Sequence, residues 1–403
     1  MKSAACDAGE GMTIDFLIVG GGIGGAVLAN LLVRSGKRVL VLEKGRTPIP
    51  QARPEVLWPA TVEFLRTLIP AALEQRWSLP IRGGAIVYCN EELLRFGPEV
   101  FDAAGVQPYS TANTRELLMQ QAACEYQRGV EVTEVLHEGE RVVGVRARDV
   151  ESSAEREILA EWTVGDDGVH SVIRRGCGLP MAVVPFPVHL LGFAFDWPAS
   201  LPANAVRIWF NKERRQTGVI AMPIVPLPEG KGVGLIPMWP EVGQDEQRLQ
   251  AALRTFAAQD PALEELIGTR AYPAGFTRFQ IGYGRTPCFG CAGALLMGDA
   301  AHPVTPAGGQ GANLSVADAR VIAETALERP QQLLDEYQRR RLAPTQRSLS
   351  FSRTATRVAS LPRFMMNMGL AILPWASRRL GKRPERFGRL LRTAAEAFRE
   401  QPT

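Results

Sequence analysis

The stretch DFLIVGGGIGGAVLANLLVRSGKRVLVLEKG, residues 15–45, decides the expected fold of this chain. Residues 14–19 form an apolar run with the length of a buried strand, and residues 38–43 form a second one. Between the two runs, apolar side chains recur at helical spacing over residues 23–35. The stretch therefore predicts a β-α-β unit, in which two parallel strands flank one helix.

The turn between the first strand and the helix carries glycines at the spacing G-x-G-x-x-G. Glycines at these positions allow a tight turn, a close approach of the backbone to a pyrophosphate, and close packing of the helix on the strand. The start of the helix also offers free N–H groups and a partial positive charge to phosphates. The expected phosphate contacts are Gly20, Gly22, Ile23, Gly24 and Gly25.

Glu43 ends the second apolar run, and Lys44 follows it. A carboxylate at this position accepts hydrogen bonds from ribose hydroxyls and repels a 2′-phosphate. We therefore expect the AMP half of NAD or FAD, rather than NADP, to bind beside Glu43 and Lys44. The β-α-β unit alone leaves the choice between NAD and FAD open.

Two later segments favour FAD. They are VGDDGVHSVIRR, residues 164–175, and LLMGDAAHPVTPAGGQGANLSVADA, residues 295–319. At these residues the chain resembles the FAD-dependent monooxygenases of the para-hydroxybenzoate hydroxylase-like family, also called class A flavoprotein hydroxylases. The G-x-G-x-x-G turn and the two later segments follow one another in the order found in that family. The segment with G-D-A-A-H-P is the most specific of the three.

The G-D-A-A-H-P segment can also be interpreted physically. A buried strand over residues 294–297 would deliver Gly298 and Asp299 to a sheet edge, and the resemblance implies that Asp299 accepts a hydrogen bond from the ribityl chain of FAD. The glycines after Pro306 let bare backbone approach a flat ring. A helix that opens at Asn313 would point N–H donors at the flavin, where negative charge appears on reduction. The expected contacts are Gly298, Asp299, Pro306, Gly308, Gly309, Gly311, Ala312 and Asn313.

The middle segment has the pattern D-G-x-x-S-x-x-R, in which Ser171 would begin a helix. The resemblance implies a link to both FAD and the reduced nicotinamide cofactor through Asp167, Gly168 and Arg174. The alternative is a capped helix start with Arg174 on a solvated face. Asp166, where the family commonly has a small residue, is a departure from the pattern.

Two arginines are further candidates for cofactor binding. Arg115 fits the family's R-x-x-L, and its planar guanidinium would lie along the pyrophosphate; the alternative is a surface charge. Arg53 is a lesser candidate for contact near the flavin. His302 lies inside the third segment, and we expect it to be a structural hydrogen-bonding group rather than a general base.

The expected fold class is α/β, or α+β with two domains: a Rossmann-like FAD-binding domain, an inserted, mostly antiparallel β-sheet and C-terminal helices. Proline-rich, alternating runs over residues 185–285 indicate the inserted sheet, and periodicity predicts helices over residues 55–70 and 109–129. The expected boundaries are 12–75, 105–180 and 286–345 for the FAD-binding domain, 76–104 and 181–285 for the substrate-binding sheet, and 346–403 for a C-terminal helical segment.

Composition and local patterns bear on the class of protein, its location and its partners. A net charge of +4 is no sign of nucleic-acid binding, and the sequence has neither a bilayer-spanning run nor a secretory signal, so we expect a cytoplasmic protein. Cys288 and Cys291 form one C-x-x-C without a second pair, so we expect small residues before a buried strand rather than a metal or redox site. The apolar and then basic residues 364–392 should pack on their own domain or on a partner chain, with contact to a membrane surface as the alternative, in a monomer or homodimer.

No residue set offers covalent or metal chemistry, so the chemistry is assigned to the flavin, and no catalytic residue is named. The resemblance implies that NADH or NADPH reduces FAD, that O2 adds at the flavin C4a, and that an aromatic or hydrophobic small molecule is hydroxylated or epoxidised. Residues 190–195, 218–223 and 234–239 should contact this substrate. The alternatives are a reductase or halogenase on the same scaffold, and a non-catalytic electron-transfer flavoprotein.

Overall fold

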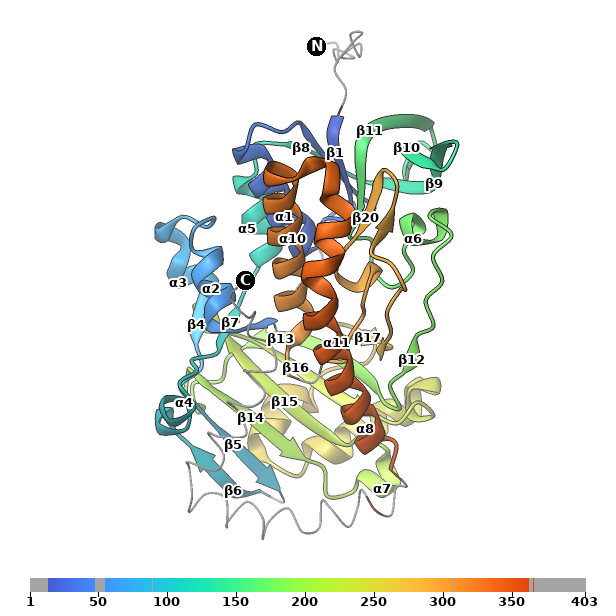
Figure 1. The fold of residues 1–403 in the computed structure, drawn as a ribbon. Coiled ribbons are helices and arrows are strands. Elements are labelled where there is room, and N and C mark those ends of the chain that lie inside the picture. Colours follow the sequence, from blue (N-terminus) through green and yellow to red (C-terminus); the bar gives the residue numbers. More distant parts are fainter. Residues whose placement is uncertain (1–13, 48–54, 89, 307, 362–364, 366–403) are drawn as a thin grey trace, which may run out of the picture.

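The computed structural model describes residues 14–47, 55–88, 90–306, 308–361 and 365. Two large β-sheets lie at opposite ends of the molecule, and a long helix, α11 (Leu333–Ala359), runs from one toward the other (Figure 1). The first sheet has parallel strands with helices beside it, and the second is mostly antiparallel. This architecture confirms the predicted fold class.

The first sheet has eight strands. Its path runs β19-β20-β11-β1-β2-β8, and β11, β10 and β9 form an antiparallel extension. The strands β20, β11, β1, β2 and β8 are mutually parallel. Their bounds are β1 Ile14–Val19, β2 Val39–Glu43, β8 Glu125–Arg128, β9 Val130–Glu138, β10 Arg141–Asp149, β11 Glu155–Gly165, β19 Gly290–Cys291 and β20 Ala294–Leu296.

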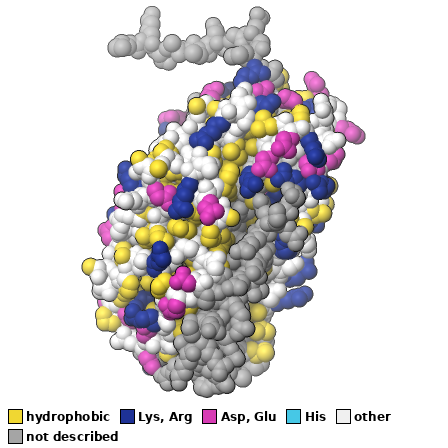
Figure 2. Space-filling model, turned by 60° about the vertical axis from the view of Figure 1, so that its left-hand side comes forward, with side chains coloured by type: hydrophobic (Ala, Val, Ile, Leu, Met, Phe, Trp, Pro, Cys, Tyr) yellow, Lys and Arg dark blue, Asp and Glu magenta, His cyan; other side chains and the backbone are white. Residues whose placement is uncertain are grey.

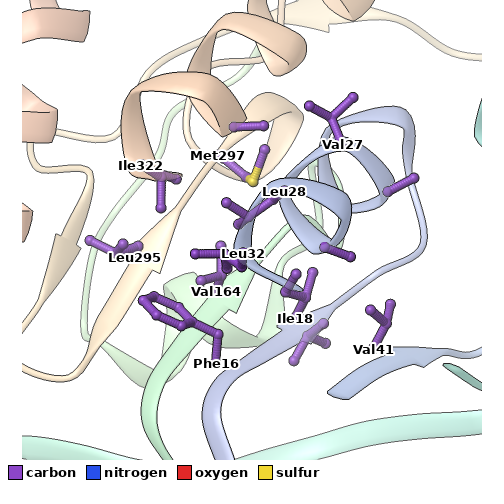
Figure 3. Close-up of a cluster of buried hydrophobic side chains, with 14 of the residues drawn as sticks. Phe16, Ile18, Val27, Leu28, Leu32, Val41, Val164, Leu295, Met297 and Ile322 are labelled. Atoms are coloured by element: carbon purple, nitrogen blue, oxygen red, sulfur yellow. The ribbon is translucent and has the colours of Figure 1, made fainter. Parts of the chain in front are cut away.

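The helices α1 (Ile23–Arg34), α5 (Thr114–Gln121) and α10 (Gln310–Glu328) pack together beside this sheet. Apolar side chains fill the space between helices and strands because each of them presents one apolar face. Figure 3 shows this core, in which strand and helix residues interdigitate. Its labelled members are Phe16, Ile18, Val27, Leu28, Leu32, Val41, Val164, Leu295, Met297 and Ile322.

The second sheet has seven strands in the order β17-β13-β16-β15-β14-β5-β6. All neighbours are antiparallel except β14 and β5. One face is covered by α8 (Glu246–Ala257), whose Leu249, Leu253 and Phe256 enter the core cluster of that face. The strand bounds are β5 Gly83–Tyr88, β6 Glu91–Phe96, β13 His189–Asp196, β14 Ala205–Phe210, β15 Ala221–Leu227, β16 Lys231–Met238 and β17 Thr277–Phe279.

Short elements complete the described chain. The strands β3 (Glu55–Leu57), β7 (Tyr109–Thr111) and β4 (Ser78–Pro80) make a three-stranded sheet, and β12 (Val184–Pro185) pairs with β18 (Gly282–Tyr283). The short helices are α2 Pro59–Leu65, α3 Glu74–Trp77, α4 Pro98–Ala104, α6 Val172–Gly176, α7 Arg214–Thr217 and α9 Pro261–Leu263.

Two helix predictions were wrong in extent. Residues 109–129 hold only α5 as a helix, because β7 pairs with β3 and β4 before it and β8 pairs with β2 after it. Residues 55–70 begin as β3, and Pro59 starts the shorter helix α2. Strand pairing between distant segments overrode helical periodicity in both places.

The surface has a mixed charge. On the face shown in Figure 2, described Lys and Arg side chains are interspersed with Asp and Glu, as the small net charge of +4 suggests. Among the described residues, none of the helices combines the length and the apolar character that a bilayer crossing needs. The predictions for residues 364–392 and for Arg53 concern residues outside the described ranges, apart from residue 365.

Candidate cofactor site

The three motif segments follow three neighbouring parallel strands. The glycine turn follows β1, Asp166 and Asp167 follow β11, and Gly298 with Asp299 follows β20. Since β1 pairs with β11 and β11 pairs with β20, the segments meet at the carboxyl ends of adjacent strands. This edge of a parallel sheet is where open α/β folds bind their ligands.

The glycine turn has no room for side chains. Gly20 has φ +104°, and a Cβ on it would lie 2.3 Å from the Asp166 carbonyl oxygen. A Cβ on Gly22 would lie 2.5 Å from Oδ2 of Asp166. The helix α1 begins after Gly22, which has no side chain to cap it, and its first turn has no acidic residue, so N–H groups at the positive end of the helix other than that of Gly25 are available to an anion.

Glu43 is fixed at the end of β2 by two backbone N–H groups. Gly21 N donates to its Oε2 at 2.9 Å, and Gly45 N donates to its Oε1 at 2.7 Å. The carboxylate therefore lies against the glycine turn, as the ribose role requires. Lys44 is more remote, because its exposed ammonium pairs with Glu131 at 2.6 Å.

Asp166 is a residue whose importance the sequence analysis missed. Its Oδ2 accepts a hydrogen bond from Gly25 N at 2.8 Å, so it caps α1 from a different strand. A Cβ on Gly298 would lie 3.0 Å from its Oδ1, so Asp166 touches all three motif segments. Burial, together with the nearby Asp299 and Asp167 carboxylates, raises the pKa of the Asp166 carboxyl well above its usual value. The sequence held one signal of this role, which was an aspartate at residue 166 where the family commonly has a small residue.

The middle motif forms a capped helix start, which was one part of the alternative interpretation. Ser171 Oγ accepts from Arg174 N at 2.9 Å, and Asp167 Oδ2 accepts from Val172 N at 2.6 Å at the start of α6. Arg174 itself is buried and donates to the carbonyls of Ala300 and Val169 at 3.0 and 2.8 Å. The solvated-face alternative is therefore wrong, and Arg174 holds the G-D-A-A-H-P segment in place.

The third motif combines an exposed acid with an uncapped helix. Asp299 is exposed at the end of β20, and Gly308 and Gly309 have φ of +78° and +64°. The helix α10 begins at Gln310 after Gly309, earlier than the predicted Asn313, because glycine adopts the left-handed conformation that starts it. The first turn of α10 has no acidic residue and no side-chain cap, so its N–H groups are available to a ligand.

Asn313 lies within this first turn rather than ahead of it. Its Nδ2 donates to the carbonyls of Val56 and Gly309 at 3.1 and 2.7 Å, and its Oδ1 accepts from Trp58 N at 3.1 Å. The side chain thus ties the start of α10 to β3 and α2. These hydrogen bonds to the protein fix the position of the Asn313 side chain.

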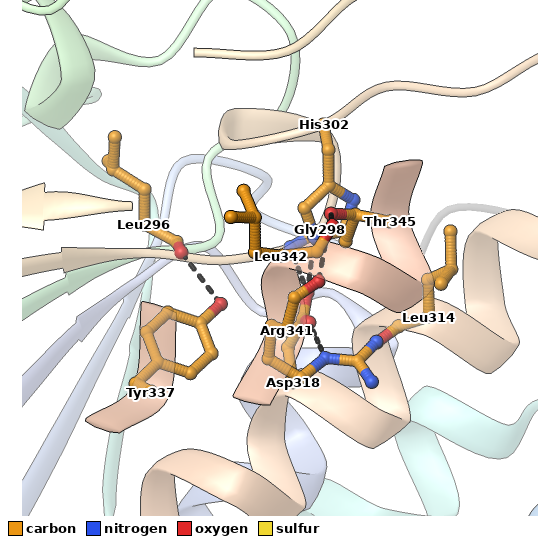
Figure 4. Close-up of polar contacts among 9 residues, drawn as sticks. All are labelled: Leu296, Gly298, His302, Leu314, Asp318, Tyr337, Arg341, Leu342 and Thr345. Carbon is orange, nitrogen blue, oxygen red and sulfur yellow. Dashed lines mark hydrogen bonds and ion pairs between the residues drawn. The ribbon is translucent and has the colours of Figure 1, made fainter. Parts of the chain in front are cut away.

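A buried ionic network supports the third motif from behind (Figure 4). Asp318 Oδ2 accepts from Gly298 N at 3.0 Å and contacts His302 Nε2 at 2.7 Å, and its Oδ1 accepts from Arg341 Nε at 2.7 Å. Burial alone would raise the pKa of Asp318, but His302 and Arg341 lower it to about 2. His302 is 1% exposed, which fits the predicted structural role. Asp318 lies within the third segment but was given no role there, and Arg341 lies outside all three segments.

Arg115 begins α5 and pairs with Glu116 at 3.0 Å, with about a quarter of its side chain exposed. Glu116 also pairs with Arg128, whose guanidinium lies over the ring of Tyr126. The hydroxyl of Tyr126 in turn lies beside Gly21. A short chain of contacts therefore connects Arg115 with the glycine turn.

The two faces of the seven-stranded sheet differ in what they contact. Leu191, Phe193 and Ile236 belong to the cluster covered by α8, whereas Leu190 and Leu235 face the other way. Val225 and Val233 on that second face pack with Val56, and Val56 also contacts Gly309. The predicted substrate segments therefore present only alternate residues toward the motif loops.

A cavity of about 430 Å³ lies elsewhere on this sheet, at the β5, β6 and β14 edge. Its lining includes Arg82, Phe96, Trp197 and Arg207. None of the predicted cofactor contacts within the described ranges lines it, so it is separate from the motif loops.

The residues at the strand ends fit FAD. Two helix starts that lack a side-chain cap from their own N-cap residue suit its pyrophosphate and the electron-rich edge of its reduced ring. The glycine turn is bare backbone packed against Asp166, Glu43 presents a carboxylate for a ribose, and Asp299 presents an exposed acceptor.

Comparisons with known proteins agree. A family model described as an FAD binding domain matches residues 13–352. Rifampicin monooxygenase of Streptomyces venezuelae is 29% identical over 80% of this chain and 67% of its own length. The corresponding values for 6-methylpretetramide 4-monooxygenase of Streptomyces rimosus are 27%, 92% and 67%. The p-nitrophenol 4-monooxygenase of Pseudomonas putida DLL-E4 has the same fold, with a TM-score of 0.73 at 19% identity over 97% of this chain and all of that one.

The chain therefore belongs to the FAD binding domain family. The resemblance to the para-hydroxybenzoate hydroxylase-like monooxygenases is confirmed, and so are FAD as the cofactor and the class of enzyme, an FAD-dependent monooxygenase. The alignments with the two Streptomyces enzymes span about two thirds of those proteins.

Proposed function

We propose that this enzyme uses NADH or NADPH and O2 to hydroxylate a large aromatic small molecule. The observation that carries the proposal is the convergence of three motif segments at the carboxyl ends of β1, β11 and β20. When bound, FAD would supply the hydride acceptor and the ring that activates oxygen. The remaining tasks, which are binding, orientation and the exclusion of water, fall to residues of this chain.

In this proposal the cofactor contacts are those predicted from the sequence. The turn from Gly20 to Gly25 and the start of α1 bind the pyrophosphate, with Arg115 beside it. Glu43 binds a ribose, and Asp299 accepts from the ribityl chain. The start of α10, with Gly308, Gly309 and Gly311 beside it, receives the flavin ring and stabilises its negative charge.

We further propose that the substrate lies between the motif loops and the second face of the seven-stranded sheet. Leu190, Leu235 and Val233 on this face are apolar and part of packed clusters, so they would exclude water around an aromatic substrate. The relatives named for rifampicin and 6-methylpretetramide support a large, polycyclic substrate. In this division, residues 12–75, 105–180 and 286–345 bind FAD, and residues 76–104 and 181–285 bind the substrate.

The test measures NADH and NADPH oxidation by the purified flavoprotein against a panel of polycyclic phenols and simple phenols, with hydrogen peroxide counted and products identified by mass. We expect one or more polycyclic phenols to stimulate oxidation and to gain one oxygen atom, labelled when ¹⁸O2 is supplied. Stimulation by simple phenols alone would contradict the proposed substrate size. Oxidation of NAD(P)H without oxygen incorporation into any member would contradict hydroxylation.

A variant tests the cofactor placement. We expect Asp299→Ala to purify with little yellow colour and to bind added FAD weakly, because the exposed acceptor is lost. Asp335→Ala is the matched control, since Asp335 is an exposed aspartate on α11 outside the proposed site. Full flavin content in Asp299→Ala would show that the ribityl contact is misplaced.

A further inference from the structure

Two cysteines from distant parts of the chain meet behind the motif loops. Cys177 directly follows α6, and Cys291 ends β19. Their sulfur atoms lie 2.7 Å apart although the residues are 114 positions apart in sequence. Both are free thiols and both are partly exposed.

From the sequence we expected no redox role for any cysteine and noted only the C-x-x-C spacing. The C-x-x-C motif joins Cys288 and Cys291, but the structure places Cys291 against Cys177 instead. Both members of the contact pack at the margin of the large core beside the eight-stranded sheet. Their positions are therefore fixed by neighbouring elements rather than by a flexible loop.

We propose that Cys177 and Cys291 are a redox-active pair that forms a disulfide when the protein meets a hydroperoxide, with hydrogen peroxide as the simplest oxidant. The Cys291 thiolate attacks one peroxide oxygen, the O–O bond breaks, and a sulfenic acid forms while the departing hydroxide takes up the proton that Cys291 had released and leaves as water. The Cys177 thiol then attacks the Cys291 sulfur and gives its proton to the sulfenic hydroxyl, which leaves as a second water. Two thiols and one H2O2 thus give one disulfide and two waters.

The local chemistry favours this order of events. The Cys177 thiol, hydrogen-bonded to Cys291, lowers the pKa of the Cys291 thiol. The thiolate is the form that reacts with peroxide, and partial exposure lets the oxidant reach it. A disulfide needs sulfurs about 2.05 Å apart, so only a small approach separates the observed contact from the bond.

The cross-link would join the backbones behind two motif segments. Cys177 lies three residues beyond Arg174, which donates to the Ala300 carbonyl. Cys291 pairs directly with Ala294 at the start of β20, which leads to Asp299. Oxidation would therefore fasten the middle motif to the third motif, and because it closes a long loop it should stabilise the folded chain.

The inference does not depend on the proposed substrate or electron donor. Reduced, FAD-loaded protein is freed of reductant, treated with hydrogen peroxide, alkylated and digested, and its peptides are identified by mass. We expect a peptide that links Cys177 to Cys291 in the wild type and in the matched control Cys288→Ser. The same treatment should raise Tm by several degrees in these two proteins and leave Tm unchanged in Cys291→Ser.

Other outcomes would overturn the proposal. A link between Cys288 and Cys291, or peroxide treatment that leaves Cys177 and Cys291 alkylated, would show that the contact is not a redox pair. Oxidation of Cys291 to sulfinic acid in the wild type would also exclude fast capture by Cys177. The peptide map of the wild type decides the question even if a cysteine variant fails to fold.

Discussion

The two sheets build their halves of the molecule in different ways. At the eight-stranded sheet, the motif loops are fixed by polar contacts among distant segments, with Asp166 bonded to Gly25 and Asp318 bonded to Gly298, His302 and Arg341. At the seven-stranded sheet, the face covered by α8 and the opposite face are both apolar. Apolar packing holds both sheets together, and directional bonds in addition fix the motif loops of the first one.

In the proposed function, the first region holds the cofactor and the second contacts the substrate. Directional contacts fix backbone N–H groups within fractions of an ångström, which a cofactor site needs. Apolar faces tolerate changes of shape, so a pocket built on them can be altered without loss of the fold. Replacing polar residues should therefore lower the free energy of unfolding most at the eight-stranded sheet. Replacing apolar residues on the two faces of the seven-stranded sheet should separate effects on stability from effects on substrate binding.

The largest expected effect is that of Asp318→Ala. Arg341 is 1% exposed, so removing its partner leaves a buried, uncompensated charge. We expect a loss of about 3–5 kcal/mol in the free energy of unfolding, measured by urea denaturation. Glu324→Gln is the control on the same helix, because Glu324 pairs with Arg320 and Arg340 near the surface. It should cost less than about 1 kcal/mol. Equal losses in the two variants would contradict the role given to the network.

The next effect compares the two faces of the seven-stranded sheet. Leu191 is fully buried against the α8 cluster, so Leu191→Ala should cost about 2–5 kcal/mol of unfolding free energy. Leu235 on the opposite face is only partly buried, so Leu235→Ala should cost less stability and raise KM for the aromatic substrate roughly tenfold. Steady-state kinetics and urea denaturation of both variants measure this. A larger KM change for Leu191→Ala would reverse the assignment of the faces.

Local signals explain what could be predicted from the sequence. The G-x-G-x-x-G turn, Glu43 and the G-D-A-A-H-P segment each encode a backbone conformation or a charge within a few residues, and the strands and helices beside them were placed correctly. The helices predicted over 55–70 and 109–129 were wrong in extent, because β3, β7 and β8 are strands only through their pairing with distant partners.

The supporting residues could not be predicted for the same reason. Asp318 and Arg341 are 23 positions apart on two helices, and nothing in their local sequence distinguishes them from surface charges. Asp166 became interpretable only when β1 and β11 lay side by side. Alternation in β13, β15 and β16 predicted strands, but only the position of α8 decides which alternate residues face the motif loops.

Acid should lower the free energy of unfolding through protonation of Asp318, by a smaller amount than Asp318→Ala or Leu191→Ala should. The pKa of Asp318 is lowered to about 2 in the folded protein, against about 3.9 in an unfolded chain. The folded state therefore gains stability from ionised Asp318 above pH 4, and it loses this gain as the pH falls from about 4 to about 2. The change amounts to about 2–3 kcal/mol. Urea denaturation across this range should show a loss in the wild type that exceeds the loss in Asp318→Asn by about this amount, because other paired carboxylates titrate in both proteins.

The smallest effect on stability is expected for Gly311→Ala, and a comparison with Gly22→Ala tests where the flavin ring lies. Among the described residues, a Cβ on Gly311 meets nothing nearer than 4.0 Å, and alanine is the better helix former, so Gly311→Ala should leave the FAD-free protein as stable as the wild type or slightly more stable. Gly22→Ala instead places its Cβ 2.5 Å from Asp166 Oδ2, so it should destabilise the FAD-free protein itself. Both should bind FAD more weakly, as measured by fluorescence titration, but for different reasons. In Gly311→Ala the new methyl group touches none of the residues that the structure describes, and the cofactor is expected to meet it, so unchanged FAD affinity there would place the flavin ring away from the start of α10.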